Sequence, residues 1–421
     1  MTRTYTDFVP AFPNRADWTL AHVLRHHARR QPDATYLIAP EEGRQFTYAQ
    51  CLESAERICG ALMGAGAQVG DRVLVMSANN SQFIRTWLAT GVAGLVEVGI
   101  NTAYEGEFLR HQVAVASPRW AVIEDKYAER FVAIAPDSRC IERFWVIDTG
   151  QREAALERLR TNGWAAEPWE ELEAAEPLVT ERPAAHTLAA IFFTSGTTGP
   201  SKGVAMPHAQ MYYFAQATAC LTRLTDQDTY MTVTPLFHGN ALFMAAYPAL
   251  IAGARLVIRS RFSASRWVDQ LRECGVTVTN FVGVMMDFTY KQPPRPDDAD
   301  NPLRCVFAAP TASGILEDFK KRFGIEAFVE VFGLTETSCP IMTPYGEPRP
   351  PAAVGLAVAD MFDIRLVDPE TDEEVPVGQV GELVVRPKYP WTTSLGYYGM
   401  PEKTAEAWRN LWFHTGDALR R

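Results

Sequence analysis

Short apolar runs rich in β-branched and aromatic residues alternate with amphipathic stretches along most of this chain. Such runs predict buried strands, and the stretches between them carry the 3.6-residue period of helices. The order strand, helix, strand predicts layers of α/β structure with largely parallel sheets flanked by helices. The predicted strands are 71–79, 119–125, 143–148, 188–193, 254–260, 276–282, 304–310 and 326–333.

Capping residues mark several helix ends. A helix is predicted to begin near Thr47 and another near Ser81. A third, within 263–275, has Ser263 or Ser265 as its expected N-cap and Gly275 after its end. Gly324 is expected to close a fourth helix, 316–324, because glycine readily adopts the left-handed conformation that ends helices.

The character of the sequence changes near residue 338. Residues 1–338 are predicted to form an α/β core of two intertwined β-sheet subdomains, with a charged, alanine-rich surface helix and connector at about 151–187. Residues 339–421 are rich in proline and predict a small β-rich, barrel-like subdomain. Within it, 363–387 reads as a hairpin whose turn is DPETD, because Asp, Pro and Thr favour turns.

Composition excludes several classes of protein. The net charge of −10 is spread along the chain, which argues against nucleic acid as a main partner. Seven dispersed cysteines, without a CxxC pair, indicate reduced thiols in a cytoplasmic protein. The longest apolar run, 241–254, contains Pro248 and is shorter than the roughly 20 residues of a membrane span. No signal peptide is visible, so a cytoplasmic protein is expected.

The segment TSGTTGPSKG, residues 194–203, predicts an anion-binding loop. We interpret it as a glycine-rich turn from a strand to a helix that begins near Pro207, with hydroxyls and one lysine around a polyphosphate. A Walker A loop requires a Ser or Thr directly after its lysine, and Gly203 follows Lys202 here. The Walker A interpretation is therefore rejected.

Together with three later segments, this loop resembles the adenylate-forming (AMP-binding) enzymes, which include acyl-CoA synthetases, firefly luciferase and peptide-synthetase adenylation domains. TSGTTGPSKG is similar to the family's phosphate loop, and VFGLTETS (331–338), GYYGMPEKTAEAW (396–408) and WFHTGD (412–417) follow in family order. Residues 101–112, NTAYEGEFLRHQ, resemble the carnitine and crotonobetaine CoA ligase branch. The resemblance implies the fold of the family's large N-terminal domain.

The resemblance also implies ATP and Mg²⁺ as cofactors and assigns roles to individual residues. Lys202 would hold the departing phosphates, Thr335 would contact the α-phosphate and Glu336 would hold the metal ion. One carboxylate suffices for a Mg²⁺ ion that bridges phosphates. The implied phosphate-binding set is Thr194, Ser195, Gly196, Thr197, Thr198, Gly199 and Lys202, and the implied adenosine-binding set is Ala308, Ala309, Pro310, Phe332, Gly333 and Asp417.

Two of these positions depart from the family pattern. Phe332 stands where tyrosine is commoner, which keeps a stacking surface but removes a hydroxyl. Ala308 stands where glycine is usual, which puts the close backbone approach there in doubt.

The acid is expected to bind near His238, which follows the family's residue beside the substrate carboxylate. The expected acyl pocket consists of His238, Asn240, Phe281, Val284, Met285, Thr311 and Cys339. This mixed lining suits a small or medium acid, aliphatic or aromatic. Asn240 provides no carboxylate for a substrate ammonium group, which weakens the amino-acid alternative.

The sequence leaves three functions open: an acyl-CoA ligase with CoA as acceptor, an enzyme that passes the acyl group to an amine or carrier protein, and a non-catalytic nucleotide-binding module. Family members carry a small C-terminal domain with a catalytic lysine after the TGD motif, whereas this sequence stops four residues after Asp417. We expect a piece of a longer protein rather than a natural protein that lacks this domain, with slow adenylation and no thioester formation by itself. The sequence does not determine an oligomeric state, and a homodimer is left open.

Overall fold

Two parallel-rich sheets form the larger part of the fold in a computed structural model that describes residues 3–194, 200–347, 350 and 352–421. Within these residues, sheet A and sheet B each have seven strands, and each ends in one antiparallel strand. In spatial order, sheet A consists of β14 (Ala327–Val329), β13 (Cys305–Ala309), β12 (Val278–Val282), β10 (Thr229–Thr232), β11 (Arg255–Ile258), β1 (Thr35–Ala39) and β2 (Arg44–Thr47). Sheet B consists of β7 (Ala165–Pro168), β6 (Arg143–Ile147), β5 (Trp120–Glu124), β3 (Arg72–Met76), β4 (Val96–Gly99), β8 (Leu188–Thr194) and β9 (Lys202–Pro207). The predicted fold class is confirmed.

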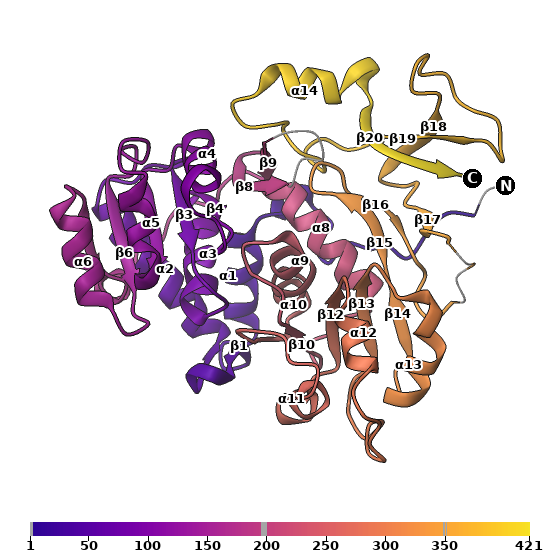
Figure 1. Ribbon diagram of the computed structural model, residues 1–421, viewed down its shortest axis with the longest axis horizontal. Helices are drawn as coiled ribbons and strands as arrows, with labels where there is room; N and C mark the ends of the chain where they lie inside the picture. Colours follow the sequence, from indigo (N-terminus) through magenta and orange to yellow (C-terminus); the bar gives the residue numbers. More distant parts are fainter. Residues whose placement is uncertain (1–2, 195–199, 348–349, 351) are drawn as a thin grey trace.

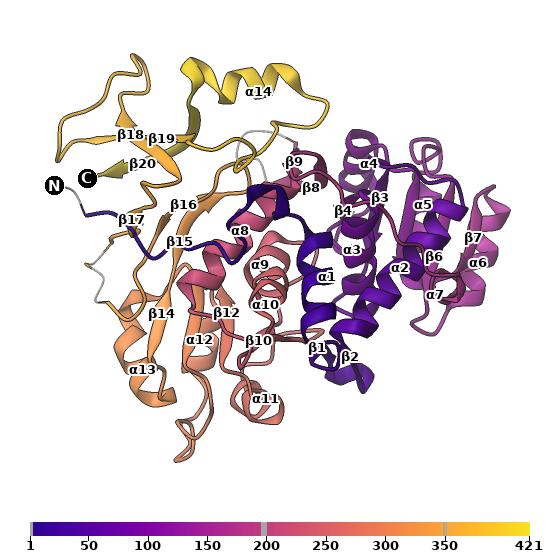
Figure 2. The same ribbon diagram turned by 180° about the vertical axis from the view of Figure 1, so that it is seen from behind.

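The two sheets face each other across a shared core, and each carries further helices on its other face (Figures 1 and 2). The shared core includes α1 (Leu20–Arg30), α2 (Tyr48–Gly64), α3 (Ser81–Ala93), α8 (His208–Leu221) and α10 (Tyr247–Ala252). Helix α8 is buried at nearly every position, including its polar residues His208, Gln210 and Gln216. The outer face of sheet B carries α4 (Gly106–Ala116), α5 (Ala128–Ala133) and α6 (Arg152–Thr161), and that of sheet A carries α11 (Trp267–Cys274), α12 (Met285–Tyr290) and α13 (Leu316–Phe323).

The C-terminal part contains two small antiparallel sheets. One is formed by β15 (Val331–Leu334), β16 (Ser338–Met342) and β17 (Leu356–Ala357), and the other by β18 (Phe362–Val367), β19 (Val380–Pro387) and β20 (Phe413–Arg420). A last helix, α14 (Pro401–Ala407), lies near β20, shown in yellow in Figure 1. The predicted hairpin at 363–387 is the pair β18–β19. The predicted boundary at residue 338 falls inside the β15–β16 hairpin, and the division into domains stays a prediction.

Several helix ends follow their capping signals. Thr47 caps α2 through a capping box with Gln50, and Gly275 and Gly324 end α11 and α13 in the left-handed conformation. The expected N-cap of α11 is wrong. Residues 263–266 form a turn, closed by a bond from the Arg266 amide to the Ser263 carbonyl, and the helix begins only at Trp267.

The connector predicted at about 151–187 contains more structure than expected. Its helix is α6, but Ala165–Pro168 adds the edge strand β7 to sheet B in parallel with β6, and α7 (Glu170–Ala174) follows. Strand 326–333 also differs, because Glu330 separates β14 of sheet A from β15 of the next sheet.

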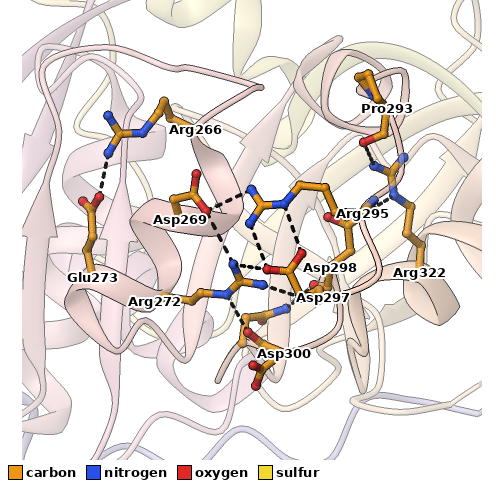
Figure 3. A network of polar contacts seen from close by, with 11 residues as sticks. Arg266, Asp269, Arg272, Glu273, Pro293, Arg295, Asp297, Asp298, Asp300 and Arg322 are labelled. Atoms are coloured by element: carbon orange, nitrogen blue, oxygen red, sulfur yellow. Dashed lines mark hydrogen bonds and ion pairs between the residues drawn. The ribbon is translucent and has the colours of Figure 1, made fainter.

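A network of ion pairs ties the proline-rich loop after α12 to two helices of the outer face of sheet A (Figure 3). Arg295 bonds Asp269 of α11 at 3.0 Å, and Arg322 of α13 bonds the buried Asp298 at 2.7 Å. The further members drawn are Arg266, Arg272, Glu273, Pro293, Asp297 and Asp300. Exposed pairs of this kind contribute little singly, whereas the buried Asp298 depends on its partner.

Candidate functional site

Lys202 opens strand β9 and pairs with Thr194 at the end of β8. The phosphate loop therefore joins two antiparallel strands, and the predicted strand-to-helix turn is wrong: α8 begins only after β9, at His208. Ser195, Gly196, Thr197, Thr198 and Gly199 lie outside the described residues. The C-terminal end of the loop is bonded to α4, because His111 Nε2 of that helix lies 2.7 Å from the Ser201 carbonyl.

Thr335 and Glu336 occupy the turn of the β15–β16 hairpin. Gln210 of the buried helix α8 holds this turn, because its side-chain amide nitrogen donates to the Thr335 carbonyl at 2.7 Å. The Glu336 side chain is buried in spite of its charge. A buried carboxylate requires a hydrogen-bond partner.

That partner is Tyr397, which the sequence analysis did not single out. Its hydroxyl donates to Glu336 Oε1 at 2.9 Å, and the face of its ring lies 4.3 Å from Lys202 Nζ. Burial, followed by the nearby Glu336 carboxylate, raises the pKa of Tyr397, so the hydroxyl stays a donor. The only signal in the sequence was the position of Tyr397 inside the family-like segment 396–408. One aromatic side chain thus joins the predicted phosphate lysine to the predicted metal carboxylate.

Asp417 lies on β20, in a different sheet from Lys202 and Glu336. Burial and then the neighbouring Glu382 raise the pKa of its carboxyl. Among the described residues, no hydrogen bond or ion pair joins Asp417 to Lys202, Glu336 or Phe332. Its predicted role toward the ribose stays a prediction.

Three of the residues predicted to line the adenosine site, Ala308, Ala309 and Pro310, lie at the end of strand β13 or directly after it. Ala308 is fully buried and packs in the outer core of sheet A, whereas Ala309 is only partly buried and Pro310 is exposed. The Thr311 amide donates to Glu330 Oε2 at 3.3 Å. Phe332 on β15 is partly buried and packs against the shared core.

Gly333 has a steric reason to be glycine. A Cβ atom at this position would lie 1.8 Å from the Ser338 carbonyl oxygen across the β15–β16 hairpin. No side chain fits at this distance. Only glycine at position 333 therefore allows the turn that carries Thr335 and Glu336 to close.

His238 stands at the start of the short helix α9 (Gly239–Ala241), where its Nδ1 accepts from the Asn240 amide at 3.2 Å. The side chain is accessible to solvent, yet surrounding protein lowers its pKa by desolvation. Accessibility combined with desolvation is typical of a residue on the wall of a concave site. The neutral imidazole is favoured there.

The other predicted pocket residues divide into buried and accessible ones. Asn240 is buried and accepts hydrogen bonds from Thr234 at 3.2 Å and from Asn280. Phe281 is 1% exposed and packs on Trp267 with ring centroids 5.1 Å apart, which gives it a core position.

Cys339 is fully buried, and burial raises the pKa of its thiol. By contrast, Val284 is 56% exposed on the turn after β12, and Met285 beside it is nearly buried. The acyl pocket as a set stays a prediction.

The donor groups fit a magnesium–nucleotide complex. Within the described residues, no cluster of three or more His, Cys, Asp or Glu side chains could enclose a metal ion. No described donor bonds Glu336 Oε2, while Oε1 is held by Tyr397. One available carboxylate oxygen beside a lysine suits a Mg²⁺ ion that takes its other ligands from phosphates and water.

The fold is that of the adenylate-forming enzymes. Residues 24–398 match the AMP-binding enzyme family, and the chain belongs to that family, as the motifs predicted. It is similar to the crotonobetaine/carnitine–CoA ligase of Salmonella enteritidis PT4 (strain P125109), with 30% identity over 382 residues that cover 89% of this chain and 72% of the relative.

Solved structures give the same fold. A putative long-chain-fatty-acid CoA ligase from Rhodopseudomonas palustris CGA009 matches with a TM-score of 0.83 and 25% identity over 96% of both chains. The anthranilate CoA ligase AuaEII in complex with anthranoyl-AMP matches with a TM-score of 0.82 and 21% identity, over 98% of this chain and 76% of that one. In the described part of the chain, no helix is both long and apolar enough to cross a membrane.

Proposed function

We propose that this chain activates a small or medium carboxylic acid with ATP, giving an acyl-adenylate and pyrophosphate, as the first half-reaction of an acyl-CoA ligase. The observation that carries this proposal is the convergence of Lys202 and Glu336 on Tyr397. Membership of the AMP-binding family and the likeness to CoA ligases support it.

In the proposed reaction, a carboxylate oxygen of the acid attacks the α-phosphorus of ATP, and the bond from that phosphorus to the pyrophosphate oxygen breaks. Negative charge then grows on the departing pyrophosphate, where the Lys202 ammonium stabilises it. Glu336 would hold Mg²⁺ against the phosphates, and the Thr335 hydroxyl beside it would bond the α-phosphate. The protein acts by positioning charges, because no covalent intermediate with a side chain is required.

His238 is proposed to face the reacting carboxylate. Its neutral imidazole, favoured by desolvation, presents a hydrogen bond without a charge that would hold the nucleophile back. Asp417 and Phe332 are proposed to bind the ribose and adenine. We propose CoA as the acceptor because the relatives named above are CoA ligases.

Acid-dependent exchange of radiolabelled pyrophosphate into ATP tests this function directly. We expect exchange that requires Mg²⁺ and one class of acid from a panel of short aliphatic, betaine-type and aromatic carboxylates. Absence of exchange with every acid, in a chain that still binds ATP by calorimetry, would favour the nucleotide-binding alternative over an enzyme.

Glu336→Gln is expected to lower the exchange rate about 10²–10³-fold. The amide keeps an acceptor for the Tyr397 hydroxyl but removes the charge that would hold the metal ion, so the fold should be unaffected. The matched control is Glu370→Ala in the exposed 368–372 turn, which should leave exchange unchanged. An unaltered rate in Glu336→Gln would remove the metal role from this residue.

A further inference from the structure

One segment of the C-terminal part connects the two halves of the proposed site. Residues 392–398, here called the strap, lie beside β9 and beside the β15–β16 hairpin, and the yellow part of Figure 1 shows this neighbourhood close to β8 and β9. At its start, the Thr392 carbonyl accepts from Ser338 Oγ at 3.2 Å. Two residues later, the Ser394 amide donates to the Glu336 carbonyl at 2.9 Å. The strap therefore begins bonded to the turn that carries Glu336.

The other end of the strap is bonded to the strand that begins with Lys202. The Leu395 amide donates to the Ala205 carbonyl at 2.8 Å, and the Ala205 amide donates to the Gly396 carbonyl at 2.9 Å. The Tyr398 amide donates to the Gly203 carbonyl at 2.7 Å. These bonds flank an antiparallel bridge between Val204 and Tyr397, so the strap lies against the edge of sheet B.

The backbone of the strap fixes the direction of Tyr397. Gly396 has a φ of +111°, a conformation that side chains disfavour, and the Tyr397 amide donates to Thr404 Oγ1 of α14 at 2.9 Å. The phenol is consequently buried and points between Glu336 and Lys202. Backbone and side chain of the strap thus act on the same two residues.

We propose that Tyr397 is a positioning residue that sets the Glu336 carboxylate relative to the Lys202 ammonium before Mg·ATP arrives. This inference rests on the proposed function and names a residue that serves the same site. The hydroxyl holds Oε1, which would leave Oε2 to a metal ion, and the face of the ring holds the ammonium of the flexible Lys202 side chain. A preorganised pair loses less conformational entropy on binding than two mobile side chains would.

Two substitutions separate the two contacts. Tyr397→Phe keeps the ring and removes the hydroxyl, so the Mg²⁺ concentration that gives half-maximal ATP binding should rise about tenfold, as expected for a lost hydrogen bond to a charged group. ATP affinity at saturating Mg²⁺ should change by less than about twofold. Tyr397→Leu also removes the ring, and ATP affinity without Mg²⁺ should fall about fivefold. Calorimetric titration measures all three quantities.

The control is Tyr398→Phe, whose backbone is held in the same ladder while no described residue bonds its hydroxyl; it should behave as the wild type. Urea denaturation midpoints show whether each variant keeps its fold. In a Glu336→Ala background, Tyr397→Phe should have no further effect on the Mg²⁺ requirement, because the hydroxyl acts through that carboxylate.

An unchanged Mg²⁺ requirement in Tyr397→Phe, or an equal loss with and without Glu336, would overturn this inference while the proposed function stands. A wild-type chain that binds no Mg·ATP would instead overturn the proposed function, and this inference with it.

Discussion

Replacing Glu97 by glutamine is expected to stabilise the protein, by an amount that grows from about 1 kcal/mol at pH 5 to about 5 kcal/mol above pH 8. Glu97 lies on β4 in the middle of sheet B, fully buried. Among the described residues, neither of its oxygen atoms has a hydrogen-bond partner, and burial raises the pKa of its carboxyl to about 8. The charged form is therefore unfavourable in the folded chain.

The sign follows from the direction of this pKa change. In the unfolded chain the carboxyl loses its proton near its ordinary pKa of 4.5, whereas the folded chain keeps the proton until about pH 8. Stability therefore falls as pH rises between these two values, and the loss is complete above the higher one. Glutamine resembles the protonated acid in shape and polarity but does not ionise, so the variant should lack this loss. At pH 7 the expected gain is about 3 kcal/mol.

Urea denaturation of both proteins at several pH values from 5 to 8.5 measures the difference. Glu124→Gln provides the matched control, because Glu124 is also buried on sheet B but forms an ion pair with Lys126 at 2.5 Å. That substitution breaks a partnered charge and should give no gain that rises with pH. A gain for Glu97→Gln that is the same at every pH would show that ionisation is not its cause.

The alternation of side chains between the two faces of a strand explains why the sequence did not predict that Glu97 is buried. Its neighbours Val96 and Val98 face the outer core of sheet B, so period two places Glu97 on the opposite face. In a sheet with one solvent-exposed face, that face would contact water, and a glutamate on it would be an ordinary surface residue. Here that face borders the shared core, in which Ala190, the partner of Glu97 on β8, is packed, so Glu97 is fully buried.

Elements that are determined by nearby residues or by a strong hydrophobic pattern were predictable from the sequence. The edge strands of the sheets were not. Thr47, Gly275 and Gly324 act within one helical turn of their own positions, so their caps could be read directly. Strand β9 begins at Lys202 and is a strand only because β8 and the strap bond its two sides. Strand β7, with the sequence AAEP, has little β propensity and depends on β6 for its hydrogen bonds.

The same division applies to the candidate site. Thr335, Glu336 and Lys202 lie in contiguous motifs, and the structure connects the last two through one side chain. Tyr397 is 61 residues from Glu336 in sequence, and no local sequence pattern predicts a hydrogen bond over that separation. Phe281 differs in the other direction: it was expected to line the acyl pocket, whereas its ring packs on Trp267 in the outer core of sheet A.

Gly333→Ala is expected to disable the site without removing any chemical group from it. The added methyl carbon would lie 1.8 Å from the Ser338 carbonyl oxygen and 2.9 Å from its carbon, so the β15–β16 hairpin must open. Both atoms belong to backbone, which cannot rotate away as the end of a side chain can. We expect a loss of about 3 kcal/mol of stability, the upper end for overpacking, and a fall in pyrophosphate exchange of at least about 10²-fold.

The exchange loss has a geometric origin. Thr335 and Glu336 form the turn of this hairpin, and the bonds from Gln210, Ser394 and Tyr397 all end on that turn. When the hairpin opens, the carboxylate leaves the hydroxyl that holds it and moves relative to Lys202. A displacement of about 1 Å is enough to cost about 10²-fold in rate when catalysis depends on positioning.

Gly314→Ala is the matched control, because the added carbon meets no atom of the described residues within 4 Å and the backbone there needs no left-handed conformation. Its urea midpoint and exchange rate should equal those of the wild type. Far-ultraviolet circular dichroism of Gly333→Ala should stay close to that of the wild type, because sheets A and B do not include this hairpin. A Gly333→Ala protein that keeps normal exchange would mean that the turn tolerates an open hairpin, and the dependence of the carboxylate on this backbone geometry would be refuted.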